Sequence, residues 1–241
     1  METSNAIRFI EAYNKIDRSL RAQYNFKRSM SFSDVVRRTV QLNAIVRKYE
    51  DILVDYGRLR NAIIHQNGQE TIIAEPHLKV VEKLEKISGL ITTPPKIMDT
   101  VARKDILCVK DTDTIEDTIV LMAQSGYSNL PIYKDDVLVG VANGQRILDK
   151  IGHNIYKKRN IEEYINHTLI SEMEKEEGLN VFYTISDVYL TIDKALNMFY
   201  HNRKLLIIII TQTGNYLEKP LGIITNTDII EINKILDNFA V

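Results

Sequence analysis

The sequence predicts an α+β protein, in which an N-terminal all-α helical bundle is followed by two copies of a β-α-β-β-α unit. Three observations lead to this prediction. Apolar residues recur at three- and four-residue steps through the first 90 residues, which is typical of helices buried on one face. Pro94 and Pro95 then end the helical pattern, because proline removes backbone donors and disfavours helix before it. Beyond them, one set of motifs occurs twice in the same order.

The N-terminal part contains several amphipathic stretches. Their apolar positions are Phe9, Tyr13, Ile16, Leu20 and Tyr24, then Tyr49, Ile52, Leu53, Tyr56, Leu59 and Ile63, and finally Leu78, Val81, Leu84 and Ile87. Ser33 is expected to cap a further helix between the first two stretches. Pro76 is expected at the first position of the last helix and Gly89 at its C-cap. Gly57 interrupts the middle stripe, either as a junction between helices or as a point of close backbone approach.

The second half of the chain is a repeat. The segment Thr114–Thr118 matches Thr191–Ala195, and Val139–Ala142 matches Leu221–Ile224 at an offset five residues larger. We place the extra residues in the loop before the last strand of the second copy, where an insertion is tolerated. The stretch Leu205–Ile210 is continuously apolar, so this strand is expected to be covered on both faces.

Composition excludes several classes of protein. The 241 residues include 31 Lys and Arg, 32 Asp and Glu and one cysteine, which excludes bulk disorder, a disulfide framework and a cysteine-rich zinc site. No apolar run approaches the roughly 20 residues of a membrane helix, and the N-terminus lacks the apolar core of a signal peptide. We therefore expect a cytoplasmic protein that holds no metal ion and does not enter a membrane.

Positive charge is concentrated in one part of the N-terminal half. Residues 18–38 contain Asp34 as their only acid. The cations of this segment are Arg18, Arg21, Lys27, Arg28, Arg37 and Arg38. Such a segment either attracts phosphate groups or forms an ordinary solvated helix surface.

The repeat resembles a tandem pair of CBS domains, an arrangement called a Bateman module. The residues that carry the resemblance are Asp113–Thr118, Leu130–Tyr133 and Val139–Val141 in the first copy, and Leu190–Leu196 and Pro220–Asp228 in the second. The resemblance implies a sensor of adenine nucleotides rather than a catalyst. The implied regulatory ligand is AMP, ADP, ATP or a cyclic dinucleotide, and no other cofactor is required.

CBS domains resemble one another in a ligand motif of Gly, two apolar residues, Ser or Thr, two more residues and Asp. The second copy has this motif intact from Gly222 to Asp228. By resemblance, Gly222 and the adjacent Ile223 bring the strand close to the ligand. The Thr225 hydroxyl would donate to a phosphate or ribose oxygen, and the Asp228 carboxylate would accept from both ribose hydroxyls. The alternative is that Thr225 and Asp228 only cap a helix.

The first copy departs from the motif at the two positions that matter most. Asn143 replaces the hydroxyl residue and Arg146 replaces the acid. A cation cannot accept hydrogen bonds from ribose hydroxyls. We therefore expect one working nucleotide site per chain, in the second copy.

Two further groups complete the expected site. Adenine is expected to lie against the strand formed by Val181, Phe182 and Tyr183. Arg203 and Lys204 precede the next strand, where they either contact phosphate or belong to the exposed surface.

The stretch Tyr56–His65 resembles the signature of HEPN domains, in which Arg and a polar residue are followed by His near a helix end. The corresponding residues are Arg60, Asn61 and His65. HEPN domains are small helical bundles that dimerise, and many are metal-independent ribonucleases. The resemblance covers residues 1–90.

Asn61 and His65 are four residues apart, so they are expected on one helix face. In a ribonuclease, His65 would take the proton of a ribose 2′-hydroxyl or protonate the leaving oxygen, and Arg60 would hold the phosphate. The products implied by the resemblance are a 2′,3′-cyclic phosphate and a 5′-hydroxyl. A two-fold dimer would bring two such sets into one cleft. The alternative is that the three residues form a structural hydrogen-bond network at a dimer interface.

The sequence thus predicts four segments. They are a HEPN-like helical bundle at 1–90, a linker at 91–96, a first CBS domain with its connecting segment at 97–169 and a second CBS domain at 170–241. The favoured function is a homodimer, formed through the bundle, the CBS pair or both, that senses an adenine nucleotide and regulates RNA cleavage. The alternatives are a non-enzymatic sensor whose bundle dimerises or binds a partner, and a bundle that binds RNA without cleaving it.

Overall fold

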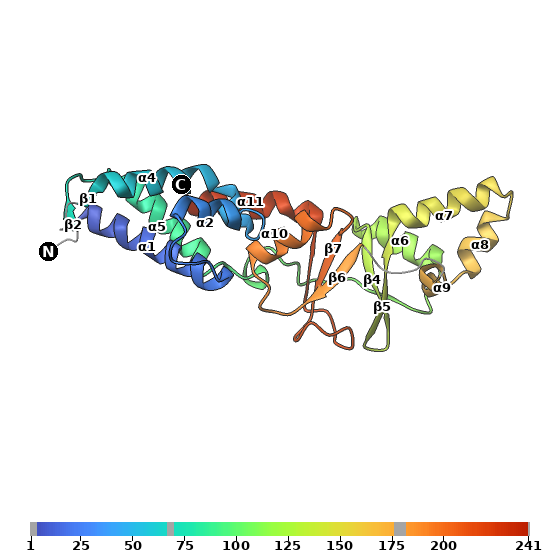
Figure 1. Cartoon of the computed structure of the whole chain (residues 1–241). Coiled ribbons are helices and arrows are strands. Elements are labelled where there is room, and N and C mark those ends of the chain that lie inside the picture. The colour runs from blue at the N-terminus through green and yellow to red at the C-terminus, as the bar shows by residue number, and fades with distance from the viewer. Residues whose placement is uncertain (1–3, 67–69, 176–181, 241) are drawn as a thin grey trace. The chain divides into compact units, whose positions relative to one another are not determined.

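The computed structural model describes residues 4–66, 70–175 and 182–240 (Figure 1). Helices and two small three-stranded sheets dominate these residues, which confirms the predicted α+β class. The elements form two compact units. The first unit contains α1 to α5, α10 and α11, and the second contains both three-stranded sheets with α6 to α9.

The first unit consists of helices and one short hairpin. Its elements are α1 (Asn5–Tyr24), α2 (Phe32–Thr39), α3 (Ala44–Lys48), α4 (Glu50–Ile63), β1 (Ile64–Gln66), β2 (Glu70–Ile72), α5 (Leu78–Thr92), α10 (Ile192–His201) and α11 (Ile229–Ala240). Helix α1 packs along α5 and also contacts α2 and α4. The α1 residues Phe9, Ile16 and Leu20 are fully buried, as the predicted apolar spacing requires.

Two expectations from the sequence concern the cap of α2 and the role of Gly57. The side chain of Ser31 accepts a hydrogen bond from the Asp34 N–H at 3.2 Å and caps α2, so the cap predicted at Ser33 is wrong by two residues. Gly57 lies inside α4, and a Cβ atom there would be 3.0 Å from Cδ1 of Phe32. Of the two explanations for this glycine, the structure supports the close approach between helices.

Both predicted ends of α5 are also shifted. The helix begins at Leu78 after its cap, His77, so Pro76 precedes the helix instead of occupying its first position. It continues to Thr92, so Gly89 lies inside the helix and is not its C-cap. The two prolines that follow end the helix, because proline restricts the residue before it to extended geometry.

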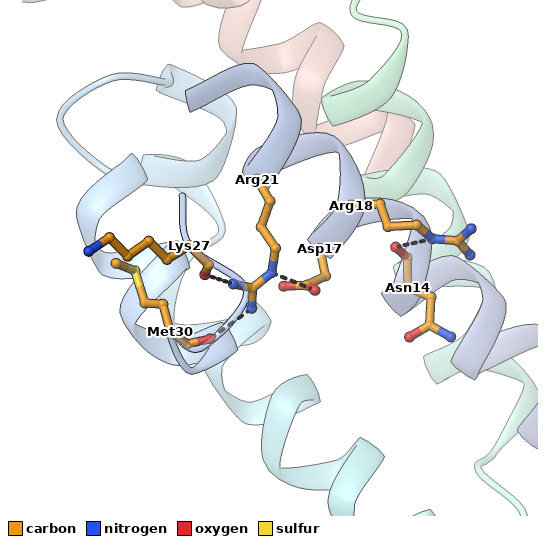
Figure 2. A network of polar contacts seen from close by, with 6 residues as sticks. All are labelled: Asn14, Asp17, Arg18, Arg21, Lys27 and Met30. Carbon is orange, nitrogen blue, oxygen red and sulfur yellow. Dashed lines mark hydrogen bonds and ion pairs between the residues drawn. The ribbon is translucent and has the colours of Figure 1, made fainter. Parts of the chain in front are cut away.

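Arg21 ties the loop after α1 to the helix (Figure 2). Its Nε donates to Oδ2 of Asp17 at 2.8 Å, and its two terminal nitrogens donate to the backbone oxygens of Lys27 at 2.7 Å and Met30 at 2.9 Å. One member of the predicted basic segment is therefore structural. Arg18 differs, because it is exposed and its Nε donates to the Asn14 oxygen of its own helix at 3.2 Å.

We expect Arg21→Ala to lower the free energy of unfolding by about 1.5–3 kcal/mol, the range for hydrogen bonds to charged groups. The substitution leaves two carbonyl groups without their donor and removes the partner of the Asp17 carboxylate. Arg18→Ala is the matched control and is expected to change stability by less than about 0.5 kcal/mol. Urea denaturation of both variants measures the difference, and equal effects would contradict the structural role of Arg21.

The second unit contains two sheets with the same topology. Its elements are β3 (Val109–Lys110), α6 (Ile115–Ser125), β4 (Asn129–Lys134), β5 (Val137–Asn143), α7 (Gly144–Tyr156), α8 (Ile161–His167), α9 (Ile170–Lys175), β6 (Tyr183–Ser186), β7 (Ile207–Ile210) and β8 (Gly222–Thr225). In each sheet the first strand is parallel to the central strand, and the central strand is antiparallel to the third. The repeat inferred from the sequence is thus present in the strand pairing.

A shared core joins the two sheets. Residues from β4, β5, β7 and β8 form one buried apolar cluster. Its members are Tyr133, Leu138, Val141, Ile207, Ile209 and Ile223. All four residues of β7 are buried, which confirms that this strand is covered on both faces. A second cluster on the first sheet includes Ile115, Ile147 and Ile170 from its helices.

The compact units do not follow the segment boundaries inferred from the sequence, because α10 and α11 of the second copy group with the N-terminal helices. Polar contacts explain this grouping. The Asn197 amide of α10 donates to the Leu42 oxygen at 2.5 Å and accepts from Arg47 at 2.9 Å. The Tyr49 hydroxyl donates to the Leu236 oxygen of α11 at 2.8 Å. The helices of one repeat thus complete the N-terminal helical unit.

Candidate functional site

A cavity of about 240 Å³ lies within the second unit. Three segments line it: the chain before β3, the turn between α6 and β4, and the end of β8 with the residues after it. The lining residues are Arg103, Asp105, Ile106, Leu107, Gly126, Tyr127, Ser128, Asn129, Ile223, Thr225, Asn226 and Thr227. Both copies of the repeat therefore contribute to one cavity.

Backbone hydrogen bonds hold these segments together. Arg103 and Ile223 exchange two N–H to O bonds of 3.0 Å each, so the segment before β3 pairs with β8. The Asn226 N–H donates to the Leu206 oxygen at 2.9 Å and fixes the turn after β8. Gly126 ends α6 in the left-handed region, with a φ of 73°, and directs the chain into the lining turn.

The lining combines apolar and polar groups. Ile106, Leu107 and Ile223 offer apolar surface of the kind that a purine ring can contact. The Oγ1 atoms of Thr225 and Thr227 are 2.7 Å apart and hydrogen-bonded to each other. Both hydroxyls border the cavity, where they can donate to or accept from a ligand.

One cation also lines the cavity. The guanidinium of Arg103 lies over the ring of Tyr127, 5.3 Å from its centroid. Such a cation–π contact helps to orient the guanidinium. Guanidinium groups bind phosphate through paired hydrogen bonds. The lining thus combines an apolar face, two hydroxyls, the Arg103 guanidinium and the Asp105 carboxylate, which can accept hydrogen bonds from ligand hydroxyls. This set suits a ligand with a flat ring, hydroxyl groups and a phosphate.

The predicted motif of the second copy is only partly at this cavity. Thr225 and Ile223 line it, whereas Gly222 and Asp228 do not. A Cβ atom on Gly222 would lie 2.5 Å from Sδ of Met98, so the close approach at this glycine is made by the chain itself. Asp228 ends the 3-10 turn Asn226–Asp228 and is half-buried.

The other predicted ligand contacts lie elsewhere. Phe182 and Tyr183 do not line the cavity, and Val181 is outside the described residues. The Phe182 ring instead lies 4.6 Å from the guanidinium carbon of Arg146. Arg203 and Lys204 are exposed in the turn before β7 and are absent from the lining.

In the first copy, Asn143 has a structural role. It is buried, and its Oδ1 accepts from the Arg146 N–H at 3.1 Å and caps α7. Its Nδ2 donates to Oδ1 of Asn129 at 2.8 Å. Asn143 and Arg146 therefore hold the chain together at the position where the second copy carries its motif.

Most of the lining carries no signal that the sequence motifs indicate, including Arg103, Tyr127, Ser128 and Thr227. Arg103, Tyr127 and Ser128 belong to loops with no motif of their own. Thr227 lies inside the predicted motif, at a position where the motif does not specify the residue. The motif could therefore have indicated that Thr227 lies near the site. Arg103 is brought to the cavity by its pairing with β8. This is a tertiary contact, which the sequence alone does not reveal.

The N-terminal candidate residues are arranged differently from the prediction. Helix α4 ends at Ile63, and His65 lies in β1 opposite Thr71. The expectation that Asn61 and His65 share a helix face is therefore wrong. The Ile73 N–H donates to the Ile63 oxygen at 2.9 Å, so hairpin pairing replaces the helical hydrogen bond at this point.

Arg60 and Asn61 remain adjacent in the last turn of α4, and Nη1 of Arg60 lies 3.5 Å from Oδ1 of Asn61. The guanidinium of Arg60 lies 6.0 Å from the ring centroid of Tyr13. Burial raises the pKa of Tyr13 to about 12, and the nearby Asp17 carboxylate adds to the rise. The Arg60 charge opposes this rise in the pKa, since a cation favours the phenolate.

The described residues contain neither a cluster of metal-ligating side chains nor a helix that could cross a membrane. Residues 4–66, 70–175 and 182–240 contain no group of three or more His, Cys, Asp or Glu side chains that could hold a metal ion. No helix in the same ranges is both long and apolar enough to cross a membrane.

One protein family is similar to part of the chain. Residues 98–153 match the family described as CBS domain. No curated protein matches the chain.

Several solved structures are similar to part of the chain. The CBS domain of a bacterial CNNM/CorC family Mg2+ transporter in complex with ATP is 21% identical, covering 63% of this chain and 94% of that chain with a TM-score of 0.44. CBSX2 in complex with AMP is 15% identical, covering 59% and 98% with a TM-score of 0.44. The CBS domain pair of MJ0100 in complex with 5-methylthioadenosine and S-adenosyl-L-methionine is 16% identical, covering 58% and 97% with a TM-score of 0.42.

The family match falls on the first β-α-β-β-α copy, and the second copy has the same strand order and pairing. The chain thus joins an N-terminal helical region to one repeat that matches the CBS domain family over residues 98–153 and to a second repeat with the same strand order.

Proposed function

We propose that this chain senses an adenine nucleotide, which it binds in the cavity formed by Arg103–Leu107, Gly126–Asn129 and Ile223–Thr227. The observation that carries the proposal is the combination of groups in one cavity lined by both repeats. The purine would contact Ile106, Leu107 and Ile223. The phosphate would lie at the Arg103 guanidinium. The proposed Asp228 contact to ribose would require the turn after Thr227 to adjust, since Asp228 does not line the cavity.

The polypeptide chain connects this cavity directly to the helical unit. The turn after Thr225 leads directly into α11, whose Leu236 oxygen accepts from the Tyr49 hydroxyl. Tyr49 immediately precedes α4, the helix that carries Arg60 and Asn61. A ligand that binds more tightly when α11 is in one position than in another would shift the helical unit toward the arrangement that accompanies that position. The difference between the two affinities sets the size of the shift.

Titration calorimetry with AMP, ADP, ATP and cyclic dinucleotides tests the nucleotide proposal. AMP and ATP come first, because CBS domains have been solved with both. Thr225→Val keeps the shape of the side chain and removes one hydroxyl, so we expect it to weaken binding by roughly threefold to tenfold, the value of a neutral hydrogen bond. Thr213→Val, on an exposed threonine outside the cavity, is the control. Absence of binding by every nucleotide would contradict the proposal.

A second candidate function is RNA cleavage by the helical unit. The observation that favours it is the short stretch of chain that carries Arg60 and Asn61 in the last turn of α4 and His65 in β1. Arg60 would hold the scissile phosphate while His65 takes the proton of the attacking 2′-hydroxyl. The hydroxyl oxygen would form a bond to phosphorus and expel the 5′-oxygen, which would take a proton from solvent, giving a 2′,3′-cyclic phosphate and a 5′-hydroxyl.

Incubation with single-stranded RNA in the presence of a chelator separates the alternatives. Cleavage that is lost in His65→Ala and retained in His153→Ala supports the ribonuclease. Binding without cleavage supports an RNA-binding bundle. If RNA neither binds nor is cut, the helical unit acts only in dimerisation or in binding another partner.

A further inference from the structure

A second cavity, of about 380 Å³, lies within the first unit. Side chains of α3, α10 and α11 line it, so an N-terminal helix and two helices of the second repeat form it together. We call it the helical cavity. Its volume lies within the roughly 300–1,000 Å³ that is usual for small-molecule sites. It shares no lining residue with the proposed nucleotide cavity.

Four apolar side chains line the helical cavity, namely Ala44, Leu196, Phe199 and Ile229. Ala44 and Phe199 are buried, whereas Leu196 and Ile229 are half-buried. A ligand that covers the exposed parts of these side chains removes apolar surface from water, which is favourable. The cavity therefore favours a ligand with an apolar body.

Arg47, which also lines the helical cavity, is held in one orientation by three contacts. Its Nε donates to the Val40 oxygen at 2.9 Å, and its Nη2 donates to Oδ1 of Asn197 at 2.9 Å. The guanidinium lies over the ring of Tyr200, 3.7 Å from its centroid. All three partners are uncharged, and the two hydrogen bonds leave Nη1 as the nitrogen that can donate to a ligand.

The two cations of the helical cavity differ in their partners. Nζ of Lys48 is 2.8 Å from Oδ1 of Asp237 and donates to Oδ1 of Asn233 at 3.4 Å. Arg47 is half-buried, and no acidic side chain among residues 4–66, 70–175 and 182–240 forms an ion pair with it. A partly desolvated cation without a counter-ion is unfavourable, so an anion in the cavity would be stabilised by Arg47.

We infer that the helical cavity binds a small organic monoanion, an aromatic carboxylate. The ring lies against Leu196, Phe199 and Ile229, and the carboxylate accepts a hydrogen bond from Nη1 of Arg47. A single negative charge matches the lining, because Asp237 already neutralises Lys48 and one positive charge remains. The site is distinct from the proposed nucleotide site in its residues and in its ligand.

Fluorine NMR of the full chain tests the inference with 4-fluorobenzoate as the probe. The unmodified chain is expected to bind it at least about tenfold more tightly than the neutral 4-fluorobenzamide, because only the carboxylate pairs with Arg47. Arg47→Gln is expected to remove this preference. Arg28→Gln, at an exposed arginine of the same unit outside the cavity, is the control and is expected to keep it. Absence of 4-fluorobenzoate binding, equal affinity for the two probes, or equal loss in the two variants would overturn the inference.

A third probe, 4-fluorophenyl phosphate, separates a carboxylate site from a phosphate site. This phosphate carries more than one negative charge at neutral pH. Because one cation of the lining is unpaired, we expect it to bind more weakly than 4-fluorobenzoate. Tighter binding of the phosphate would contradict the assignment to a monoanion.

A cavity-filling variant gives a test that leaves Arg47 in place. Leu196→Trp enlarges a half-buried side chain of the lining, so it is expected to abolish binding of 4-fluorobenzoate. Ile230→Trp, at a 68% exposed position of α11 outside the cavity, is the matched control and is expected to bind normally. Thermal melting followed by circular dichroism shows that each variant is folded. Unchanged binding by a folded Leu196→Trp would place the carboxylate elsewhere. None of the substituted residues lines the nucleotide cavity, so failure of this inference leaves the proposed nucleotide function unaffected.

Discussion

Replacement of Arg103 by alanine is expected to weaken binding of AMP or ATP by roughly tenfold to a hundredfold, the loss of a hydrogen bond to a charged group. Arg103 is the cation of the cavity lining, and its position is fixed from two sides. Its backbone exchanges two hydrogen bonds with Ile223, and its guanidinium lies over the Tyr127 ring. A phosphate bound there would meet a charge that is already oriented.

Calorimetry at low and moderate salt measures this effect. The loss caused by Arg103→Ala is expected to be larger for ATP than for adenosine, because only the phosphates interact with the guanidinium. Lys104→Ala is the matched control, since the adjacent lysine is exposed and does not line the cavity. If both variants lost affinity equally, general electrostatic attraction would explain the binding better than a phosphate site at Arg103.

The largest expected effect on stability belongs to Ile209→Ala, at about 2–5 kcal/mol of unfolding free energy. Ile209 is fully buried in β7, between Ile185 of β6 and Ile223 of β8. It belongs to the cluster that joins the two sheets, and Ile106 packs against the same cluster. Because Ile106 and Ile223 also line the cavity, the substitution is expected to weaken nucleotide binding as well.

Chemical denaturation measures the stability effect, with two further variants for scale. Ile209→Val removes a single methyl group and is expected to cost about 0.5–1.5 kcal/mol. Val120→Ala, at a 46% exposed position on α6, is expected to change stability by less than about 0.5 kcal/mol. If Ile209→Ala were no more harmful than Val120→Ala, the core between the sheets would have to be assigned differently.

Local patterns in the sequence were sufficient to predict the repeat and the covered central strand. The run Ile207–Ile210 has no polar position to face water, and all of it is buried. Thr225 was identified because its motif is contiguous along the chain. Arg103 and Tyr127 were not identified, since they reach the cavity only through pairing between segments far apart in sequence.

Helix ends were harder to predict than helix positions. The apolar stripe of α4 continues to Ile63, and nothing in its spacing indicates that the next residue is extended. The change depends on the bond from the Ile73 N–H to the Ile63 oxygen, which forms only when the hairpin folds back. For the same reason His65 was predicted to lie on a helix, although α4 ends before this residue.

The packing of α10 could not be predicted from local pattern. The sequence assigned α10 to the same segment as the strands around it. Contacts with the N-terminal helices instead group it with the first unit, through the bonds from Asn197 to Leu42 and Arg47. Polar side chains on a helix such as Asn197 resemble an exposed face in the sequence, although here they contact another part of the chain.

Hydrogen–deuterium exchange with and without a saturating nucleotide tests the central claim most directly. The account predicts that AMP or ATP slows exchange in three segments that are separate in sequence, 103–107, 126–129 and 223–227. It predicts no comparable change at 143–147, where Asn143 and Arg146 occupy the corresponding positions of the first copy. Protection confined to 143–147 or to 182–186, or binding that leaves all three segments unchanged, would contradict the assignment of the cavity as the nucleotide site.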